Sequence, residues 1–153
     1  MTLPVIRPPR LSELDALSAL QMRSKAYWGY DAAFMQACKE ELTLTPDHLT
    51  ETAIAVAVLD DALAGVAQVG PCGRDADLLG LFVDPPFIGK GVGKRLFDWC
   101  LSAARDISET RLLIEADPDA AAFYERMGAR RIGASPSGSI PGRMLPLYEI
   151  PLR

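Results

Sequence analysis

Three glycines alternate with other residues in a stretch of the chain that could bind phosphate. The segment Pro85–Phe97 reads PPFIGKGVGKRLF, with glycines at positions 89, 91 and 93. An apolar periodicity typical of a helix follows, and the next glycine is Gly128. Glycines at a helix start let a ligand approach bare main-chain amides, and a helix N-terminus favours anions. The stretch therefore predicts a phosphate-binding cradle.

Two common phosphate-binding motifs do not fit this spacing. A P-loop has four residues between its glycines and then Lys and Ser or Thr. Here three residues separate Gly89 from Gly93, and Arg95 follows Lys94. A dinucleotide fingerprint places GxGxxG directly after its strand, whereas this chain has GxGxG after an intervening segment, residues 84–88. A glycine-rich turn without a ligand is disfavoured, because each unneeded glycine in a helix costs about 0.5–1 kcal/mol.

The arrangement that fits is a strand, then V-x-P, then GxGxG, then a helix. It resembles the GNAT superfamily, the acyl-CoA-dependent N-acetyltransferases. A second segment, ADPDAAAFYERMGA, is similar to the N-x-x-A-x-x-x-Y-E-x-x-G-F pattern of that family. The positions that match this pattern are Ala120, Tyr124, Glu125 and Gly128. The region of resemblance runs from Asp77 to Ile132, over a third of the chain.

Three positions depart from the usual family residues. Ile88 stands where Gln or Arg is usual, Asp117 where Asn is usual, and Ala129 where Phe is usual. The change at Ile88 removes a side-chain contact to the cofactor but leaves the main-chain amides that bind phosphate. These departures keep open a non-catalytic acyl-CoA-binding regulatory module, while the retained Tyr124 argues against it.

The resemblance implies that acetyl-CoA is the co-substrate and that no metal takes part. It implies that the strand at 81–83 splays away from the strand at 111–116, so that the pantetheine arm hydrogen-bonds to exposed main chain. An N–H near Leu81 or Phe82 would polarise the thioester carbonyl. The implied cofactor-binding positions are Leu81, Phe82, Val83, Gly89, Lys90, Gly91, Val92, Gly93, Lys94, Asp117, Ala120 and Tyr124.

The implied reaction is direct attack of an amine on the thioester, which needs one proton removed and one supplied. Tyr124 matches the proton donor to the leaving thiolate; the alternative is a ring that packs in the core. Asp77, at the start of the cofactor strand, is the best candidate for the base. The alternatives for the base are Asp75, Glu115, Glu51 and a water molecule.

The segment SKAYWGYDAAF is expected to line the acceptor site. In the family fold, the connection between the first two helices arches over the amine pocket. Tyr27, Trp28 and Tyr30 surround Gly29 there, and aromatic faces could hold an ammonium ion by cation–π contact. The alternative is that these rings cover the sheet. No role is assigned to His48.

Hydrophobic periodicity and turn signals predict the elements that position these residues. A capping box at Ser12 and Asp15 is expected to start the first helix, and Thr45-Pro46 to start a later one. Further helices are expected from Asp31, after Gly93 and from Pro118. The expected strands lie within 3–8, 53–59, 62–70, 77–83, 111–116, 129–134 and 143–150. The expected fold is α/β (α+β), a GNAT fold with a mixed sheet of six to seven strands and about four helices.

Composition agrees with one globular domain over residues 1–153. The chain is 49% hydrophobic and 24% charged, with a net charge of −4, which provides no general footprint for nucleic acid or an anionic membrane. No apolar run approaches the ~20 residues of a membrane span, and the N-terminus lacks a signal-peptide core. Three widely spaced cysteines and one histidine provide no zinc-ligand spacing. A cytoplasmic protein with reduced thiols is expected.

The sequence thus predicts an N-acetyltransferase that moves an acetyl group from acetyl-CoA to a small primary amine. Acetylation of a peptide or protein, at its N-terminus or a lysine, is the alternative acceptor class. A homodimer remains an alternative to the monomer.

Overall fold

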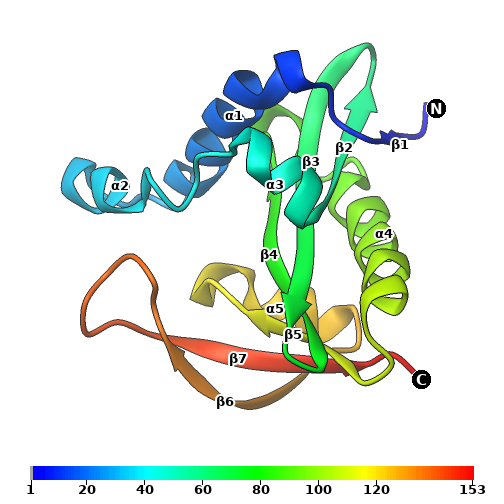
Figure 1. Cartoon of the computed structure of the whole chain (residues 1–153). Helices are drawn as coiled ribbons and strands as arrows, with labels where there is room; N and C mark the ends of the chain where they lie inside the picture. The colour runs from blue at the N-terminus through cyan, green and yellow to red at the C-terminus, as the bar shows by residue number, and fades with distance from the viewer. Residues whose placement is uncertain (1) are drawn as a thin grey trace.

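A mixed seven-stranded sheet forms the centre of the structure, a computed structural model that describes residues 2–153 (Figure 1). The strand order is β1-β2-β3-β4-β5-β7-β6. Only β4 and β5 pair in parallel, and all other neighbours are antiparallel. The strands are β1 Val5–Arg7, β2 Ala53–Leu59, β3 Ala62–Cys72, β4 Asp75–Val83, β5 Arg111–Glu115, β6 Arg130–Pro136 and β7 Met144–Pro151.

Five α-helices and three short 3₁₀ turns accompany the sheet. The helices are α1 Leu14–Ala26, α2 Ala32–Cys38, α3 Pro46–Glu51, α4 Val92–Ile107 and α5 Ala121–Arg126. The 3₁₀ turns are η1 Leu11–Glu13, η2 Pro85–Phe87 and η3 Pro118–Ala120. The expected mixed α/β architecture is confirmed. No helix of the described residues is both long and apolar enough to cross a membrane.

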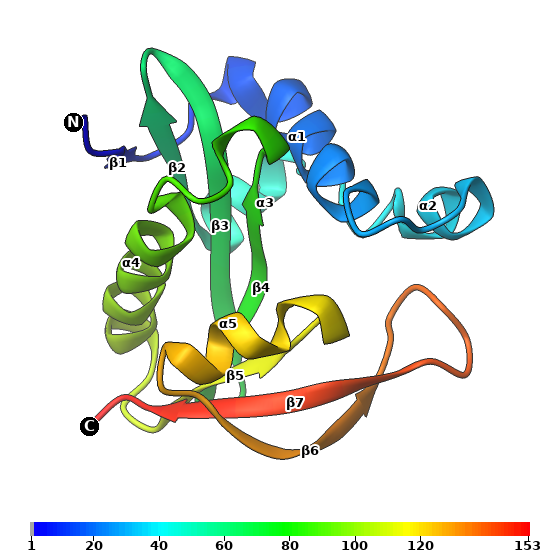
Figure 2. The ribbon, with the colours of Figure 1, turned by 180° about the vertical axis from the view of Figure 1, so that it is seen from behind.

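The hydrophobic core consists of two clusters, one on each face of the sheet. Helices α4 and α5 cover one face, and α1 and α3 pack on the other (Figure 2). The amphipathic face of α4 buries Leu96, Phe97 and Cys100 against the sheet. Gly65 on β3 permits this close packing, because a Cβ there would lie only 2.8 Å from the Leu96 side chain.

Strands β4 and β5 pair over a short distance and then separate. Their register contains only Ala76↔Leu112 and Asp77↔Leu113. On its other edge β4 remains paired with β3 as far as Val83. The β5-facing edge of β4 is therefore unpaired beyond Asp77, and Figure 1 shows the two ribbons diverging. The expected splay at 81–83 is confirmed.

The expected capping box at Ser12 and Asp15 is wrong. The chain enters α1 through η1, and the Glu13 carboxylate accepts the Arg10 main-chain N–H at 2.8 Å. The Glu13 carboxylate also pairs with the Arg7 guanidinium, which holds it at the start of the 3₁₀ turn. The cofactor strand begins at Asp75, two residues earlier than expected, because β3 and β4 form a long hairpin.

Candidate functional site

The glycine loop lies between the end of β4 and the start of α4. Gly89 has φ +82° and Gly91 has φ +81°, and no atom lies within 4 Å of where a Cβ would stand at either position. These two residues need a left-handed backbone that side chains disfavour. Gly93 differs, because its Cβ would lie 3.4 Å from the Phe123 ring. Two glycines thus shape the loop, and the third allows α4 to approach Phe123.

The main-chain amides of this loop point to no acceptor within the chain. In residues 2–153, no N–H from Gly89 to Lys94 donates to another main-chain group. Unpaired amides at the start of the 16-residue α4 form an anion site that the helix dipole strengthens. The residues present therefore fit a pyrophosphate.

Side chains in the loop contribute unequally. Val92 is buried in the core and offers only its amide. Lys94 pairs with Asp98 at 3.6 Å on the exposed surface of α4, while the Lys90 ammonium lies 5.9 Å from the Phe87 ring centroid. Ile88 is exposed. Lys90 is thus the basic side chain of the loop that has no carboxylate within ion-pair distance in the described structure.

An ion pair that the sequence analysis missed holds the loop against α1. The Arg23 guanidinium donates two hydrogen bonds to the Asp84 carboxylate, at 3.0 and 3.1 Å. The Asp84 N–H also donates to the Ala64 carbonyl at 2.8 Å. Asp84 directly follows β4, so these contacts fix the point at which the chain leaves the sheet for the glycines. The sequence signal that could have indicated this pair was the acidic residue Asp84 within the V-x-P motif.

Tyr124 lies in α5 with its ring buried. The ring contacts Phe123 and Phe97, with centroid distances of 5.3 and 6.0 Å. Its hydroxyl forms no hydrogen bond within the described chain, and no fully buried side-chain oxygen there lacks a partner. The hydroxyl is therefore not fully enclosed by the described chain, although the residue is buried. Burial, with smaller contributions from Cys100 and Asp117, raises the pKa of Tyr124 well above its ordinary value. The phenol is protonated at neutral pH, as a proton donor must be.

Asp77 lies where β4 and β5 begin to separate, opposite Leu113. Burial raises the pKa of Asp77 to about 6, and the nearby charge of Glu115 adds to the shift. Its expected rival Asp75 accepts a hydrogen bond from the Thr110 hydroxyl at 2.6 Å, which lowers the pKa of Asp75. A base should titrate near the working pH, so the structure favours Asp77 over Asp75.

Five residues from five segments form a polar and aromatic cluster that we call the Asp117 cluster. Its members are Lys25, Tyr30, Phe34, Asp117 and Arg143. The Lys25 ammonium and the Tyr30 hydroxyl each donate to the Asp117 carboxylate at 2.7 Å. The Arg143 guanidinium donates to the Tyr30 hydroxyl at 2.8 Å. Sequence reasoning assigned no role to Lys25, Phe34 or Arg143. The Lys25–Asp117 and Arg143–Tyr30 contacts are long-range, whereas the Tyr30–Phe34 stack has a local spacing of four residues.

The rings of this cluster already have cations beside them. Tyr30 and Phe34 stack with centroids 3.9 Å apart. The Lys25 ammonium and the Arg143 guanidinium each lie 5.2 Å from the Tyr30 centroid. Tyr27 and Trp28, by contrast, are exposed and meet edge to face at 5.4 Å. The three aromatic residues expected at the acceptor site therefore fall into two groups.

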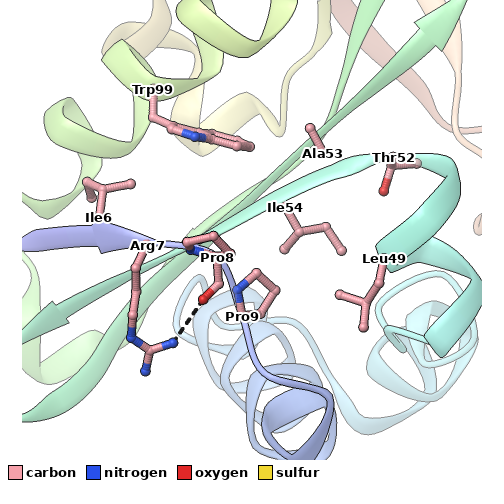
Figure 3. Close-up of a pocket in the computed structure, with 9 residues that line it drawn as sticks. All are labelled: Ile6, Arg7, Pro8, Pro9, Leu49, Thr52, Ala53, Ile54 and Trp99. Carbon is pink, nitrogen blue, oxygen red and sulfur yellow. Dashed lines mark hydrogen bonds between the residues drawn. The ribbon is translucent and has the colours of Figure 1, made fainter.

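A surface depression of about 420 Å³ lies elsewhere, at the β1–β2 edge of the sheet. Trp99 lies along one side of it, and Ile54, Leu49 and Pro9 are among the other residues that line it (Figure 3). None of the residues expected at the site contributes to it. The candidate site is instead the opening between β4 and β5, with the glycine loop at one end.

Comparisons with known proteins agree with this geometry. Residues 17–137 match the family profile described as acetyltransferase (GNAT) domain. The chain is 32% identical over 147 residues to the peptidyl-lysine N-acetyltransferase YjaB of Salmonella typhimurium, covering 95% of each chain.

Solved structures share the fold at low sequence identity. PaiA N-acetyltransferase from Thermoplasma acidophilum, in complex with coenzyme A, has a TM-score of 0.77 at 17% identity, covering 97% of this chain and 98% of that one. YncA from Salmonella typhimurium, with acetyl-CoA, has a TM-score of 0.69 at 16% identity, covering 99% and 95%.

Proposed function

The chain belongs to the GNAT family of acetyltransferases, and we propose that it transfers the acetyl group of acetyl-CoA to a small primary amine by direct attack. The separation of β4 from β5 carries this proposal, because it opens unpaired main chain between the glycine loop and Tyr124. The loop amides from Gly89 to Lys94 would hold the pyrophosphate. The free edge of β4 at Leu81–Val83 would hold the pantetheine arm and polarise the thioester carbonyl.

Two side chains would handle the protons. Asp77, with its pKa raised to about 6, would take the proton from the incoming ammonium near neutral pH. Tyr124 would protonate the leaving thiolate through its hydroxyl. The raised pKa makes this phenol a weaker acid than a thiol, whose ordinary pKa is about 8.5. Transfer of its proton would therefore be coupled to breaking of the C–S bond, and the second proton lost by the attacking amine would restore the phenol. General acid–base assistance of this kind is worth about 10²–10⁴ in rate.

The Asp117 cluster supports a small acceptor. It joins the α1–α2 connection to the loop between β6 and β7, two segments that the ribbon draws on either side of a gap (Figure 1). The Ser139 hydroxyl of the same loop also contacts Glu41, which lies between α2 and α3. Side chains thus bridge the acceptor side of the opening. A bridge at this place would restrict the approach of a lysine on a folded protein more than that of a small amine.

A peptidyl lysine is the second candidate acceptor. The observation that favours it is the 32% identity to a peptidyl-lysine acetyltransferase over nearly the whole chain. The exposed Tyr27 and Trp28 could provide a surface for a peptide, and we keep all three aromatic residues as proposed acceptor contacts.

Thiol release measured with a panel of primary amines and lysine peptides tests the proposal. The expected result is release that depends on a small amine and yields its N-acetyl product by mass spectrometry. Release only with lysine peptides would favour the second candidate. Binding of acetyl-CoA with no release for any acceptor would support the regulatory module instead.

A further inference from the structure

Arg143 is a largely enclosed cation with few partners. Its side chain is 19% exposed. It donates one hydrogen bond, to the neutral Tyr30 hydroxyl, and its guanidinium lies 3.7 Å from the Asp117 carboxylate, beyond hydrogen-bond distance. A guanidinium has five N–H donors. No fully buried side-chain nitrogen in the described chain lacks a partner, so the guanidinium nitrogens of Arg143 that make no hydrogen bond are not fully enclosed by the chain.

The Asp117 cluster contains one positive charge too many. Lys25 and Arg143 share the single carboxylate of Asp117, and Lys25 holds it more closely, at 2.7 Å. Within residues 2–153, neither cation has another carboxylate within 4 Å. Glu41 contacts Ser139 and forms no ion pair with Arg143. Cation–π contacts with Tyr30 and Phe34 compensate in part, but they leave the net charge of the cluster positive.

This surplus charge lies close to the proposed reaction site. Asp117 directly precedes η3 and α5, which carry Tyr124. The Asp117 charge is also one cause of the raised pKa of Tyr124. Arg143 itself directly precedes β7 and contacts Tyr30 and Asp117. A small acceptor that extends from the thioester toward Asp117 would meet Arg143 with its other end.

Resting on the proposed function, we infer that the acceptor amine also carries a carboxylate, which Arg143 binds. A planar guanidinium fits a carboxylate through two parallel hydrogen bonds. A carboxylate has one negative charge and balances the surplus of the Asp117 cluster. A phosphate monoester would overbalance it, since its charge at neutral pH is about −1.5 to −2. The acceptor class is an amino acid or a similar compound with a primary amine and a carboxylate.

Paired acceptors test this inference. Glycine, β-alanine, 4-aminobutanoate, phenylalanine and methionine are each compared with their neutral carboxamides, and kcat/KM is measured for both members of a pair. In the pair that the wild type acetylates best, kcat/KM is expected to be higher for the carboxylate than for the carboxamide. Arg143→Gln is expected to reduce this ratio about tenfold or more. Arg143→Lys should retain part of it. Comparing each variant with the wild type on the same pair cancels the difference in amine basicity.

Arg105→Gln, at an exposed position of α4, is the control and should leave the preference unchanged. A role of Arg143 limited to folding would lower kcat/KM equally for both members of a pair and would overturn the inference. A wild type that acetylates both members equally would also overturn it, while the proposed function would stand.

If the wild type acetylates no small amine, the proposed function fails, and calorimetry then decides the inference separately. The same paired compounds are titrated into the complex with coenzyme A. The inference is supported if the wild type binds the carboxylate more tightly than the carboxamide and Arg143→Gln abolishes this difference. Equal binding of both members by the wild type overturns it.

Discussion

At the scale of single residues, burial and backbone geometry assign the chemistry. Gly91 has a left-handed backbone, and Asp77 and Tyr124 both have raised pKa values because they are withdrawn from water. The same physical cause has opposite uses here. Burial keeps the proton on a phenol that must donate it, and brings a carboxyl group that must accept a proton close to neutral pH.

Replacing Gly91 with Asp should weaken acetyl-CoA binding at least about tenfold, or about 1.4 kcal/mol. The new carboxylate would face the pyrophosphate, and the left-handed φ of +81° would strain the side chain. Calorimetry with acetyl-CoA measures the effect. Gly73→Asp is a matched control, since Gly73 also has a positive φ and open surroundings but lies at the opposite end of β4. Equal affinities for the two variants would refute the cradle assignment.

Tyr124→Phe should lower kcat about tenfold or more and barely change the affinity for acetyl-CoA. The substitution keeps the ring against Phe123 and Phe97 and removes only the hydroxyl. Steady-state kinetics and calorimetry separate the two quantities. Tyr148→Phe is the control, because Tyr148 is also buried but donates its hydroxyl to Glu125. Loss of the Tyr148 hydroxyl should reduce stability and leave kcat unaltered. An undiminished kcat in Tyr124→Phe would leave that ring with a packing role alone.

Asp77→Asn should lower kcat and remove the rise of rate with pH that is expected around the Asp77 pKa of about 6. It should also change stability. The folded chain holds the Asp77 proton more tightly than the unfolded chain, where the pKa is about 3.9. Wild-type stability therefore falls as pH rises from about 4 through about 6. The variant lacks this loss.

Two measurements check both effects of Asp77→Asn. Thermal unfolding at about pH 4 and about pH 7 should show the variant gaining stability relative to the wild type at the higher pH. The pH profile of kcat/KM should lose its ascending limb. If that limb persists unchanged, another group is the base, and Glu115 is then the first to test.

At the scale of elements, strand pairing and one ion pair position the site. The register of β4 is set by β3 along its length, and β5 joins it only at Ala76 and Asp77. The V-x-P and GxGxG spacing was sufficient to predict this strand, loop and helix, because each is specified locally. The Arg23–Asp84 pair was not predictable, since 61 residues separate its members.

Arg23→Met should weaken acetyl-CoA binding about threefold to tenfold, because the glycine loop would lose its attachment to α1. The expected loss lies toward the lower end of this range, because the Arg23 side chain is 54% exposed. Exposed pairs contribute about 0.2–1 kcal/mol, or up to about fivefold in affinity. Arg7→Met breaks a similar bidentate pair, with Glu13, and should not change the affinity. Calorimetry compares the two variants, and equal losses would mean that Arg23 supports only the fold.

At the scale of the whole molecule, the splayed sheet creates two halves that side chains must reconnect. One half contains α1 to β4, and the other contains β5 to β7 with α5. Resemblance in the segment 77–132 was sufficient to predict the overall fold. The acceptor side was predicted less well, since the Asp117 cluster unites residues from position 25 to position 143. Tyr27, Trp28 and Tyr30 were predicted to form one aromatic wall. In the structure Tyr27 contacts Trp28, whereas Tyr30 stacks on Phe34.

If the Asp117 cluster holds the halves together, its members should be energetically coupled. Lys25→Met removes one of two cations and leaves Asp117 with Tyr30 and Arg143, so a loss of about 1 kcal/mol in unfolding free energy is expected. Asp117→Asn should cost more, because it leaves both cations without a carboxylate. The double variant should lose less unfolding free energy than the two single variants lose together. The difference, which is the coupling energy, should be about 1 kcal/mol. Urea unfolding of the wild type, both single variants and the double variant measures this coupling. Strictly additive losses would show that Lys25 and Asp117 stabilise the fold independently, and the proposed bridge over the acceptor side would then lose its energetic basis.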